Sequence, residues 1–416
     1  MQNTPERDPW FQSLFAERIG GVGYGKGTDI YKFEKIKRAK RAALQEHPER
    51  RLLDFGIGEN DDMADPLVRE TLKREVDKLE NRGYADNGIA AFREAAAEFM
   101  KRQFGVELDP ATEINHAIGS KPALAMLPAV FINPGDVTLM TVPGYPVAGT
   151  HTRYYGGDVY QLPLREENGF LPDLTSIPAE VRRRAKLLVL NYPNSPTGAV
   201  ASLDFYRQVI DFAHTNRIVV VQDAAHILLT YAGAPLSFLQ VDGAKEVGVE
   251  VHSLSKGFNM IGWRMAFVTG HPRIVRAFAD VKDNCDSGQF MAIQQAAQTA
   301  LLHGEIAART REKYRRRLQK LVDALSKVGF RARMPGGSYF LYVPAPSGCA
   351  GQSFANAEAA SQYLIREQSV CCVPWDDAGA YLRFSATYLA ASEAEEDDLM
   401  GETVRRLGRL AMRFSS

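Results

Sequence analysis

Residues 253–264 of this 416-residue chain place one lysine among hydroxyl, glycine and arginine side chains. Lys256 follows Ser253 and Ser255, and Arg264 comes eight positions later. A lysine amine can form a Schiff base with an aldehyde, and hydroxyl groups and a guanidinium suit a phosphate held beside it. The combination indicates pyridoxal phosphate. Taken alone, a surface lysine in a serine- and glycine-rich loop explains the segment equally well.

Further polar residues follow apolar, β-branched stretches that are typical of buried strands. They are Ser120 after residues 114–118, Tyr145 after 137–141, Asn194 after 187–190, Asp223 after 218–222 and Lys256 after 249–252. Open α/β sheets bind ligands at the carboxyl ends of their strands, so we expect these side chains to meet at one edge. Each of the first four could singly be a cap, a turn residue or core. Independent caps, however, have no reason to follow successive strands in this order.

Each of these residues meets a different need of that cofactor. Lys256 would carry the aldehyde and then move the proton from the substrate Cα. Asp223 would keep the pyridine nitrogen protonated, and Asn194 would donate a hydrogen bond to the phenolate oxygen. The Tyr145 ring would stack on the pyridine.

The phosphate needs donors and positive charge. A helix that begins at Ser120 would present free N–H groups to it. Ser253, Ser255 and Arg264 would complete the match of charge and hydrogen bonds.

The elements that position these residues form an α/β fold. Short strands separated by helical stretches need crossover connections, which predicts a mostly parallel sheet between helices. After about residue 305 a long charged helix leads to mixed strands and helices, typical of a smaller α+β domain completed by the N-terminal arm. We therefore predict an arm at 1–50, a large cofactor-binding domain at 51–305 and a small domain at 306–416.

Composition excludes several classes of protein. Apolar residues make up 45% and charged residues 24%, as in an average soluble protein, and 50 basic residues balance 50 acidic ones. Neither nucleic acid nor a membrane is expected as a partner. The arginine runs at 182–184 and 315–317 are predicted to be solvated helix faces. No stretch of about 18 apolar residues and no signal peptide is evident.

The four cysteines, Cys285, Cys349, Cys371 and Cys372, have no C-x-x-C spacing, so we expect no metal site and no disulfide framework. A cytoplasmic location is predicted.

Three motifs resemble those of the fold-type-I, class I and II aminotransferases. Residues 191–198 read N-Y-P-N-S-P-T-G, Asp223 precedes Ala224 and Ala225, and residues 253–264 read S-L-S-K-G-F-N-M-I-G-W-R. The resemblance covers nearly the whole chain. It implies a homodimer with shared active sites and suggests Arg383 as the clamp on the substrate α-carboxylate, where a surface arginine on a strand is the alternative.

Shorter segments resemble LL-diaminopimelate aminotransferases. Residues 31–38 read Y-K-F-E-K-I-K-R and residues 55–61 read F-G-I-G-E-N-D. By that resemblance Tyr31 and Gly58 face the substrate and Lys121 joins the phosphate site. The implied reaction transfers an amino group from an amino acid to a 2-oxo acid by a ping-pong cycle, with LL-2,6-diaminopimelate and 2-oxoglutarate as the leading pair.

Three positions depart from the family pattern. His226 stands where the family has a tyrosine beside the cofactor, so the second hydrogen bond to the phenolate oxygen must come from an imidazole or from elsewhere. A core histidine is the alternative. Residues 84–88 read Y-A-D-N-G and lack the family glutamate, which weakens Tyr84 as a cross-subunit phosphate contact. Residues 283–290 read D-N-C-D-S-G-Q-F where the family commonly has an N-G or N-S-G turn from the partner subunit, which leaves Ser287 as a possible second cross-subunit contact.

Alternatives therefore stay open. Another amino acid, such as aspartate or an aromatic one, could be the donor. A β-lyase or an oxidative deaminase would use the same cofactor with different chemistry. A transcription regulator with an aminotransferase-like domain would need a DNA-binding module, for which the N-terminal arm is too short and the net charge of zero unsuited.

Overall fold

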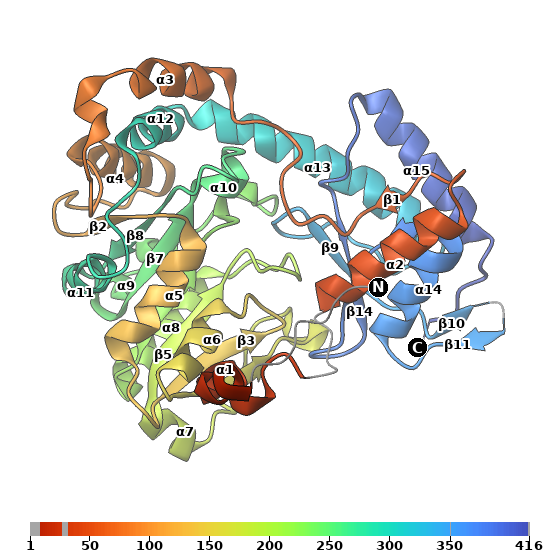
Figure 1. Cartoon of the computed structure of the whole chain (residues 1–416), viewed down its shortest axis with the longest axis horizontal. Helices are drawn as coiled ribbons and strands as arrows, with labels where there is room; N and C mark the ends of the chain where they lie inside the picture. The colour runs from red at the N-terminus through yellow and green to blue at the C-terminus, as the bar shows by residue number, and fades with distance from the viewer. Residues whose placement is uncertain (1–8, 27–31, 350, 415–416) are drawn as a thin grey trace.

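A seven-stranded sheet organises the larger part of the chain in the computed structural model, which describes residues 9–26, 32–349 and 351–414 (Figure 1). Neighbouring strands run parallel except on the two sides of β8, which is antiparallel to both neighbours. This confirms the predicted mostly parallel sheet. In spatial order the strands are β2 (Ile114–Ala117), β8 (Ala266–Gly270), β7 (Gly248–Ser253), β6 (Val219–Asp223), β5 (Ala185–Asn191), β3 (Val137–Val142) and β4 (Asp158–Pro163).

Helices cover both faces of this sheet, which explains why its strands are continuously apolar. Along β5, Leu187 and Val189 join one apolar cluster, and Leu188 and Leu190 join the other. The first cluster includes residues of α5 (Ser120–Phe131), α6 (Val147–Tyr154) and α11 (Pro272–Lys282). The second includes residues of α3 (Pro66–Val76), α4 (Ala90–Phe104), α8 (Leu203–Asn216) and α12 (Met291–Leu302).

The smaller part lies at the far end of the long helix α13 (Gly304–Lys327) (Figure 1). Its antiparallel sheet has the order β13 (Val373–Trp375), β14 (Tyr381–Ser385), β9 (Phe340–Pro344). The helices α14 (Ala357–Gln368) and α15 (Glu393–Gly408) belong to it, and α2 (Lys32–Glu46) packs on it through Ile36, Ala39 and Ala43. The domain boundaries stay predictions. β1 (Leu53–Asp54), which we predicted in the larger domain, pairs with β12 (Val370–Cys371).

The remaining described elements are short. They are α1 (Pro9–Leu14), α7 (Ala179–Arg184), α9 (Ala244–Val247), α10 (Leu254–Gly257), the hairpin β10 (Gly348–Cys349) with β11 (Gln352–Ser353), and single 3-10 turns. No helix of the described ranges is long and apolar enough to cross a membrane.

Two expectations differ from the structure. The edge strand β4 was not predicted, because its residues are mostly exposed or half-exposed and form no apolar run. The prediction that residues 315–317 lie on a solvated face was wrong for Arg317, whose side chain is 1% exposed and forms ion pairs with Asp61 and Glu396.

Candidate active site

Strand directions bring the site residues to one edge of the large sheet. The carboxyl ends of β2, β3, β5, β6 and β7 lie there because these strands run the same way. β8 runs the opposite way, so its amino end lies at that edge too. Arg264, two residues before β8, therefore joins the side chains that follow the other strands.

Lys256 lies in α10, directly after β7. Ser253 caps this helix, with its Oγ accepting a hydrogen bond from the Ser255 amide at 3.2 Å. The lysine Nζ donates to the carbonyl of Gly58 at 3.1 Å and lies 5.3 Å from the centre of the Tyr339 ring. The amine thus points away from its own helix toward the segment after β1.

Burial lowers the pKa of Lys256 to about 8. Arg264 and Arg383 add to this effect, whereas the carboxylates of Glu59 and Asp223 oppose it. A lysine with such a pKa exchanges protons readily near neutral pH, which suits a nucleophile or a base.

Asp223 and Asn194 are buried polar residues at the carboxyl ends of neighbouring strands: Asp223 is the last residue of β6, and Asn194 lies three residues after β5. The Asp223 carboxylate accepts one hydrogen bond, from the Ala225 amide at 3.0 Å, and burial raises its pKa to about 6. Asn194 is fully buried, and its Oδ1 accepts hydrogen bonds from the amide and the hydroxyl of Thr197 at 3.1 and 2.8 Å. Its Nδ2 has no hydrogen-bond partner among the described residues. An unpaired buried donor costs free energy, so it marks a place for a ligand acceptor.

A helix start and a guanidinium form an anion site. Gly119 precedes α5 with φ of +85° and contributes no side-chain cap, and Ser120 is the first residue of the helix. A Cβ on Gly119 would lie 2.2 Å from Nη2 of Arg264, so the guanidinium packs on this glycine. Arg264 Nη1 donates to the Ile261 carbonyl at 2.8 Å. Free helix amides and a fixed guanidinium together suit a phosphate. Lys121 is exposed beside this site.

Arg383 is a buried arginine that forms no ion pair with a carboxylate of the described residues. Its Nη2 donates to the Gly56 carbonyl at 3.1 Å, and its guanidinium lies 4.2 Å from the centre of the Phe340 ring. Its Nε has no partner in the described part of the chain, and burial lowers its pKa to about 10. Gly58 leaves space beside it, since a Cβ there would be 3.7 Å from Nη2. Such a guanidinium is suited to a carboxylate.

His226 follows β6 and is held neutral. Its Nδ1 makes a hydrogen bond with the Ser338 hydroxyl at 3.2 Å, and its ring packs edge-on against Tyr339 at 5.2 Å. Burial lowers its pKa to about 3, and the nearby cations of Lys256 and Arg383 contribute. The side chain therefore has one ring N–H to donate.

The family profile described as Aminotransferase class I and II matches residues 50–398. The chain belongs to the class I and II aminotransferases. This confirms the predicted family, and with it an enzyme that transfers amino groups.

Two curated relatives resemble this aminotransferase over almost its whole length. The LL-diaminopimelate aminotransferase of Methanocaldococcus jannaschii is 56% identical over 416 residues, covering 98% of this chain and 100% of the relative. The enzyme of the same name from Methanococcus maripaludis is 55% identical over 414 residues, with the same coverage. These identities confirm the predicted resemblance of this chain to the LL-diaminopimelate aminotransferases.

Solved structures share the fold. A substrate-bound BacF structure from Bacillus subtilis superposes with a TM-score of 0.85 at 30% identity, covering 97% of this chain and 99% of the other. A probable N-succinyldiaminopimelate aminotransferase from Thermus thermophilus gives a TM-score of 0.81 at 27% identity, with 91% and 100% coverage.

Four other residues that we predicted for the site of this aminotransferase lie at its periphery or outside the described residues. They are Tyr145, Tyr84, Ser287 and Tyr31. Tyr145 is 40% exposed in the turn between β3 and α6. Tyr84 is 84% exposed, and its segment lies beside that of Ser287, where the Ala85 amide donates to the Ser287 carbonyl at 3.4 Å. Tyr31 lies outside the described residues.

The sequence did not predict the contacts that distant segments make with the Lys256 and Gly58 backbone. Asn60 Nδ2 donates to the Lys256 carbonyl at 2.8 Å, and the Tyr339 hydroxyl donates to the Gly58 carbonyl at 2.9 Å. Ser338 was missed as well. The glycine pair at 336–337 just before a strand was the available signal for Ser338 and Tyr339.

Proposed function

We propose that this aminotransferase holds pyridoxal phosphate at the sheet edge described above. The fully buried Nδ2 of Asn194 carries this proposal, because it has no acceptor within the described part of the chain and a phenolate oxygen is the kind of acceptor it lacks. The packing of Arg264 on Gly119 at the start of α5 supports a phosphate position. The other groups that would hold the cofactor are Asp223 at the ring nitrogen, His226 near the phenolate oxygen, Tyr145 on the ring face, and Ser120, Lys121, Ser253 and Ser255 near the phosphate.

The residues divide the chemistry among themselves. Bound pyridoxal phosphate supplies an aldehyde that accepts the amino group and a ring that withdraws electrons from the substrate Cα. Lys256, with its pKa of about 8, would take the proton from the substrate Cα and deliver it to the cofactor carbon that carried the aldehyde. Asp223 holds a proton on the ring nitrogen through its negative charge. Arg383 orients the α-carboxylate with its forked donors.

The substrate pair that we propose is LL-2,6-diaminopimelate and 2-oxoglutarate, in a ping-pong cycle of lysine biosynthesis. The amino donor leaves as its oxo acid before the second oxo acid binds and is aminated. The support is that both relatives are LL-diaminopimelate aminotransferases, at 56% and 55% identity over nearly the full length. Tyr31 and Gly58 stay our candidates for additional substrate contacts.

A half-reaction screen tests this proposal. Purified enzyme loaded with pyridoxal phosphate is mixed with single amino acids, and the visible absorption of the bound cofactor is followed. LL-diaminopimelate should abolish the band stoichiometrically, 2-oxoglutarate should restore it, and kcat/KM should exceed that for aspartate, phenylalanine and N-succinyl-diaminopimelate. A higher kcat/KM for one of these would refute the substrate, and ammonia released over many turnovers would point to a lyase or an oxidative deaminase.

A homodimer and a cytoplasmic location complete the proposal. Trp10 and Phe11 of α1 are 63% and 56% exposed and Tyr84 is 84% exposed, which supports a surface that a second copy covers. Tyr84 and Ser287 would then reach the partner's site. Sedimentation velocity checks the oligomeric state, and a monomer at micromolar concentration would contradict it.

A further inference from the structure

The segment of residues 56–62 connects the two cationic groups of the active site. Three consecutive carbonyl groups of this loop accept hydrogen bonds from side chains. The Gly56 carbonyl accepts from Arg383 Nη2 at 3.1 Å, and the Ile57 carbonyl accepts from Thr387 Oγ1 at 3.0 Å. The Gly58 carbonyl accepts from Lys256 Nζ at 3.1 Å. The position of this backbone therefore determines where both the guanidinium and the amine lie.

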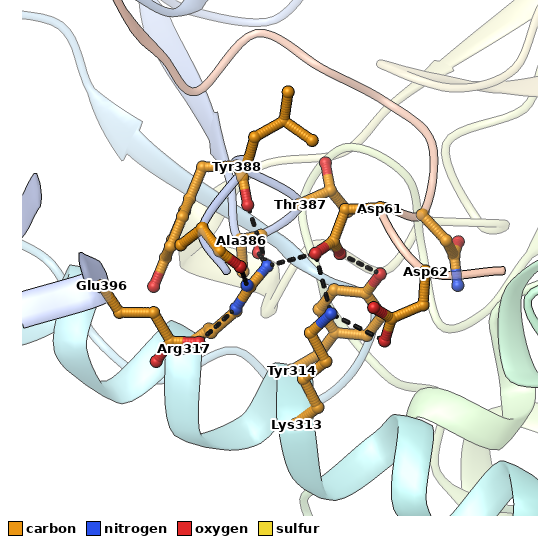
Figure 2. A network of polar contacts seen from close by, with 12 residues as sticks. Asp61, Asp62, Lys313, Tyr314, Arg317, Ala386, Thr387, Tyr388 and Glu396 are labelled. Atoms are coloured by element: carbon orange, nitrogen blue, oxygen red, sulfur yellow. Dashed lines mark hydrogen bonds and ion pairs between the residues drawn. The ribbon is translucent and has the colours of Figure 1, made fainter. Parts of the chain in front are cut away.

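Asp61 attaches the end of the loop to α13. Its Oδ1 accepts a hydrogen bond from the Tyr314 hydroxyl at 2.9 Å, and its Oδ2 accepts from Lys313 Nζ at 2.7 Å and Arg317 Nη1 at 2.9 Å (Figure 2). The Asp61 side chain is 5% exposed. All three donors come from two consecutive turns of one helix, so the carboxylate holds the loop at a fixed position along the axis of α13.

Arg317 is itself fixed from the opposite side. Its side chain is 1% exposed, and its Nε donates to Glu396 Oε1 at 2.7 Å. Its Nη1 donates to the carbonyl of Tyr388 at 2.9 Å (Figure 2). Its Nη2 donates to the carbonyl of Ala390 at 3.2 Å. A buried ion pair contributes little net stability compared with apolar packing, so its value here lies in fixed geometry.

We propose that Asp61 and Arg317 are positioning residues for transamination: their ion pair fixes loop 56–62, and the loop carbonyls set the separation of the Arg383 guanidinium from the Lys256 amine. This inference rests on the proposed roles of Lys256 and Arg383. Neither Asp61 nor Arg317 touches substrate.

The loop also limits access of water to Lys256. The charged and titratable groups that face the amine are Glu59 of the loop, Asp223 and His226 after β6, Arg264 before β8, Arg383 of β14 and, on the ring side, Tyr339. Burial is the largest cause of the lowered pKa of Lys256. Release of the loop should therefore raise that pKa toward the ordinary value of 10.5.

Asp61→Asn is the decisive variant, because it removes the charge and keeps the side-chain shape. Two matched controls exist. Asp62→Asn changes the next residue, which pairs with the same Lys313 but is 49% exposed and does not contact Arg317. Glu396→Gln removes the other buried carboxylate from Arg317 without touching the loop.

The first readout uses cofactor-free protein and no substrate. Acetylation of Lys256 by acetic anhydride is followed by mass spectrometry across pH, which gives the pKa of this amine. D61N should raise the pKa by about one unit or more, so that labelling at neutral pH slows about tenfold. D62N should match the parent, and E396Q, which leaves the Asp61–Arg317 pair in place, should change the pKa far less than D61N. Because the amine is titrated without substrate, a failed substrate assignment leaves this result intact.

The second readout separates kcat from KM in the loaded enzyme. D61N should lower kcat about tenfold to a hundredfold, because a small displacement of a base costs that much, with little change in D62N. E396Q should lower the melting temperature and change kcat far less than D61N, because Arg317 keeps its bonds to Asp61 and to two backbone carbonyls. A parental Lys256 pKa and kcat in D61N would overturn the proposal, and so would equal effects in E396Q, which would indicate a structural role alone. If D61N does not fold, Thr387→Val removes the hydrogen bond to the Ile57 carbonyl and is read in the same way.

Discussion

A methyl group at Gly119 should weaken cofactor binding by displacing Arg264. In Gly119→Ala the added carbon would lie 2.2 Å from Nη2 and 2.8 Å from Cζ of the guanidinium. An ordinary contact between such atoms needs roughly 3.5 Å, so the guanidinium must retreat by about 1 Å or the start of α5 must shift. Either movement separates the two halves of the anion site.

The size of the effect follows from the interaction that is lost. A hydrogen bond to a charged group contributes about 1.5–3 kcal/mol. Its loss corresponds to a dissociation constant that is roughly 10- to 150-fold larger. The backbone adds a second cost, since φ of +85° with ψ of 156° is a region used almost only by glycine. That strain, about 1–3 kcal/mol, lowers stability whether or not cofactor is present.

The assay titrates cofactor-free protein with pyridoxal phosphate and, separately, with pyridoxal, which has no phosphate. Gly119→Ala should weaken binding of pyridoxal phosphate and leave pyridoxal binding unchanged. Gly105→Ala is the control, because Gly105 also has a positive φ, +68°, and a Cβ there would meet nothing within 4 Å. It should lose stability only. Equal affinity of G119A and the parent for pyridoxal phosphate would refute the phosphate position.

Two further predictions use buried polar groups. Because the pKa of Asp223 is raised from 3.8 to about 6, its ionisation destabilises the cofactor-free fold progressively as pH rises between these values, and fully above pH 6. Asp223→Asn should therefore raise the unfolding free energy, measured by urea unfolding, by up to about 3 kcal/mol at pH 7.5 and about half that at pH 5. The variant should also lose most of its activity. An equal gain in stability at both pH values would contradict the raised pKa of Asp223 as the cause. Ser338→Ala should let the His226 ring exchange between tautomers, seen as averaged ¹⁵N shifts of its ring nitrogens, and unchanged shifts would exclude Ser338 as the group that fixes the tautomer.

The strand ends could be predicted from the sequence because buried parallel strands carry continuous apolar runs. That pattern identified the stretches before Asn194, Asp223 and Lys256. The edge strand β4 is mostly exposed or half-exposed, so its residues form no continuous apolar run and carry no such signal.

Contacts between distant segments could not be predicted in this way. Tyr339 meets the Gly58 carbonyl across 281 positions, and Asn60 meets the Lys256 carbonyl across 196. Periodicity describes the environment of a residue on its own element but contains no information on which segments pack together. Arg317 illustrates the opposite error, because a charged helix face is usually solvated and only the tertiary fold places two carboxylates against it.

The signs of the pKa shifts distinguish groups that serve the reaction from groups that hold the fold. Burial moves Lys256, Arg383 and Asp223 toward their neutral forms. A ligand with a phosphate, a protonated ring nitrogen and a carboxylate would supply the counter-charges, so binding should stabilise the protein by relieving this cost. The charges of Asp61 and Arg317, by contrast, already balance each other in the ion pair of the folded protein. Removing a charge from the first set should therefore stabilise the cofactor-free protein, and removing Asp61 should destabilise it. Thermal unfolding of cofactor-free D223N and D61N, measured side by side, tests this difference in sign.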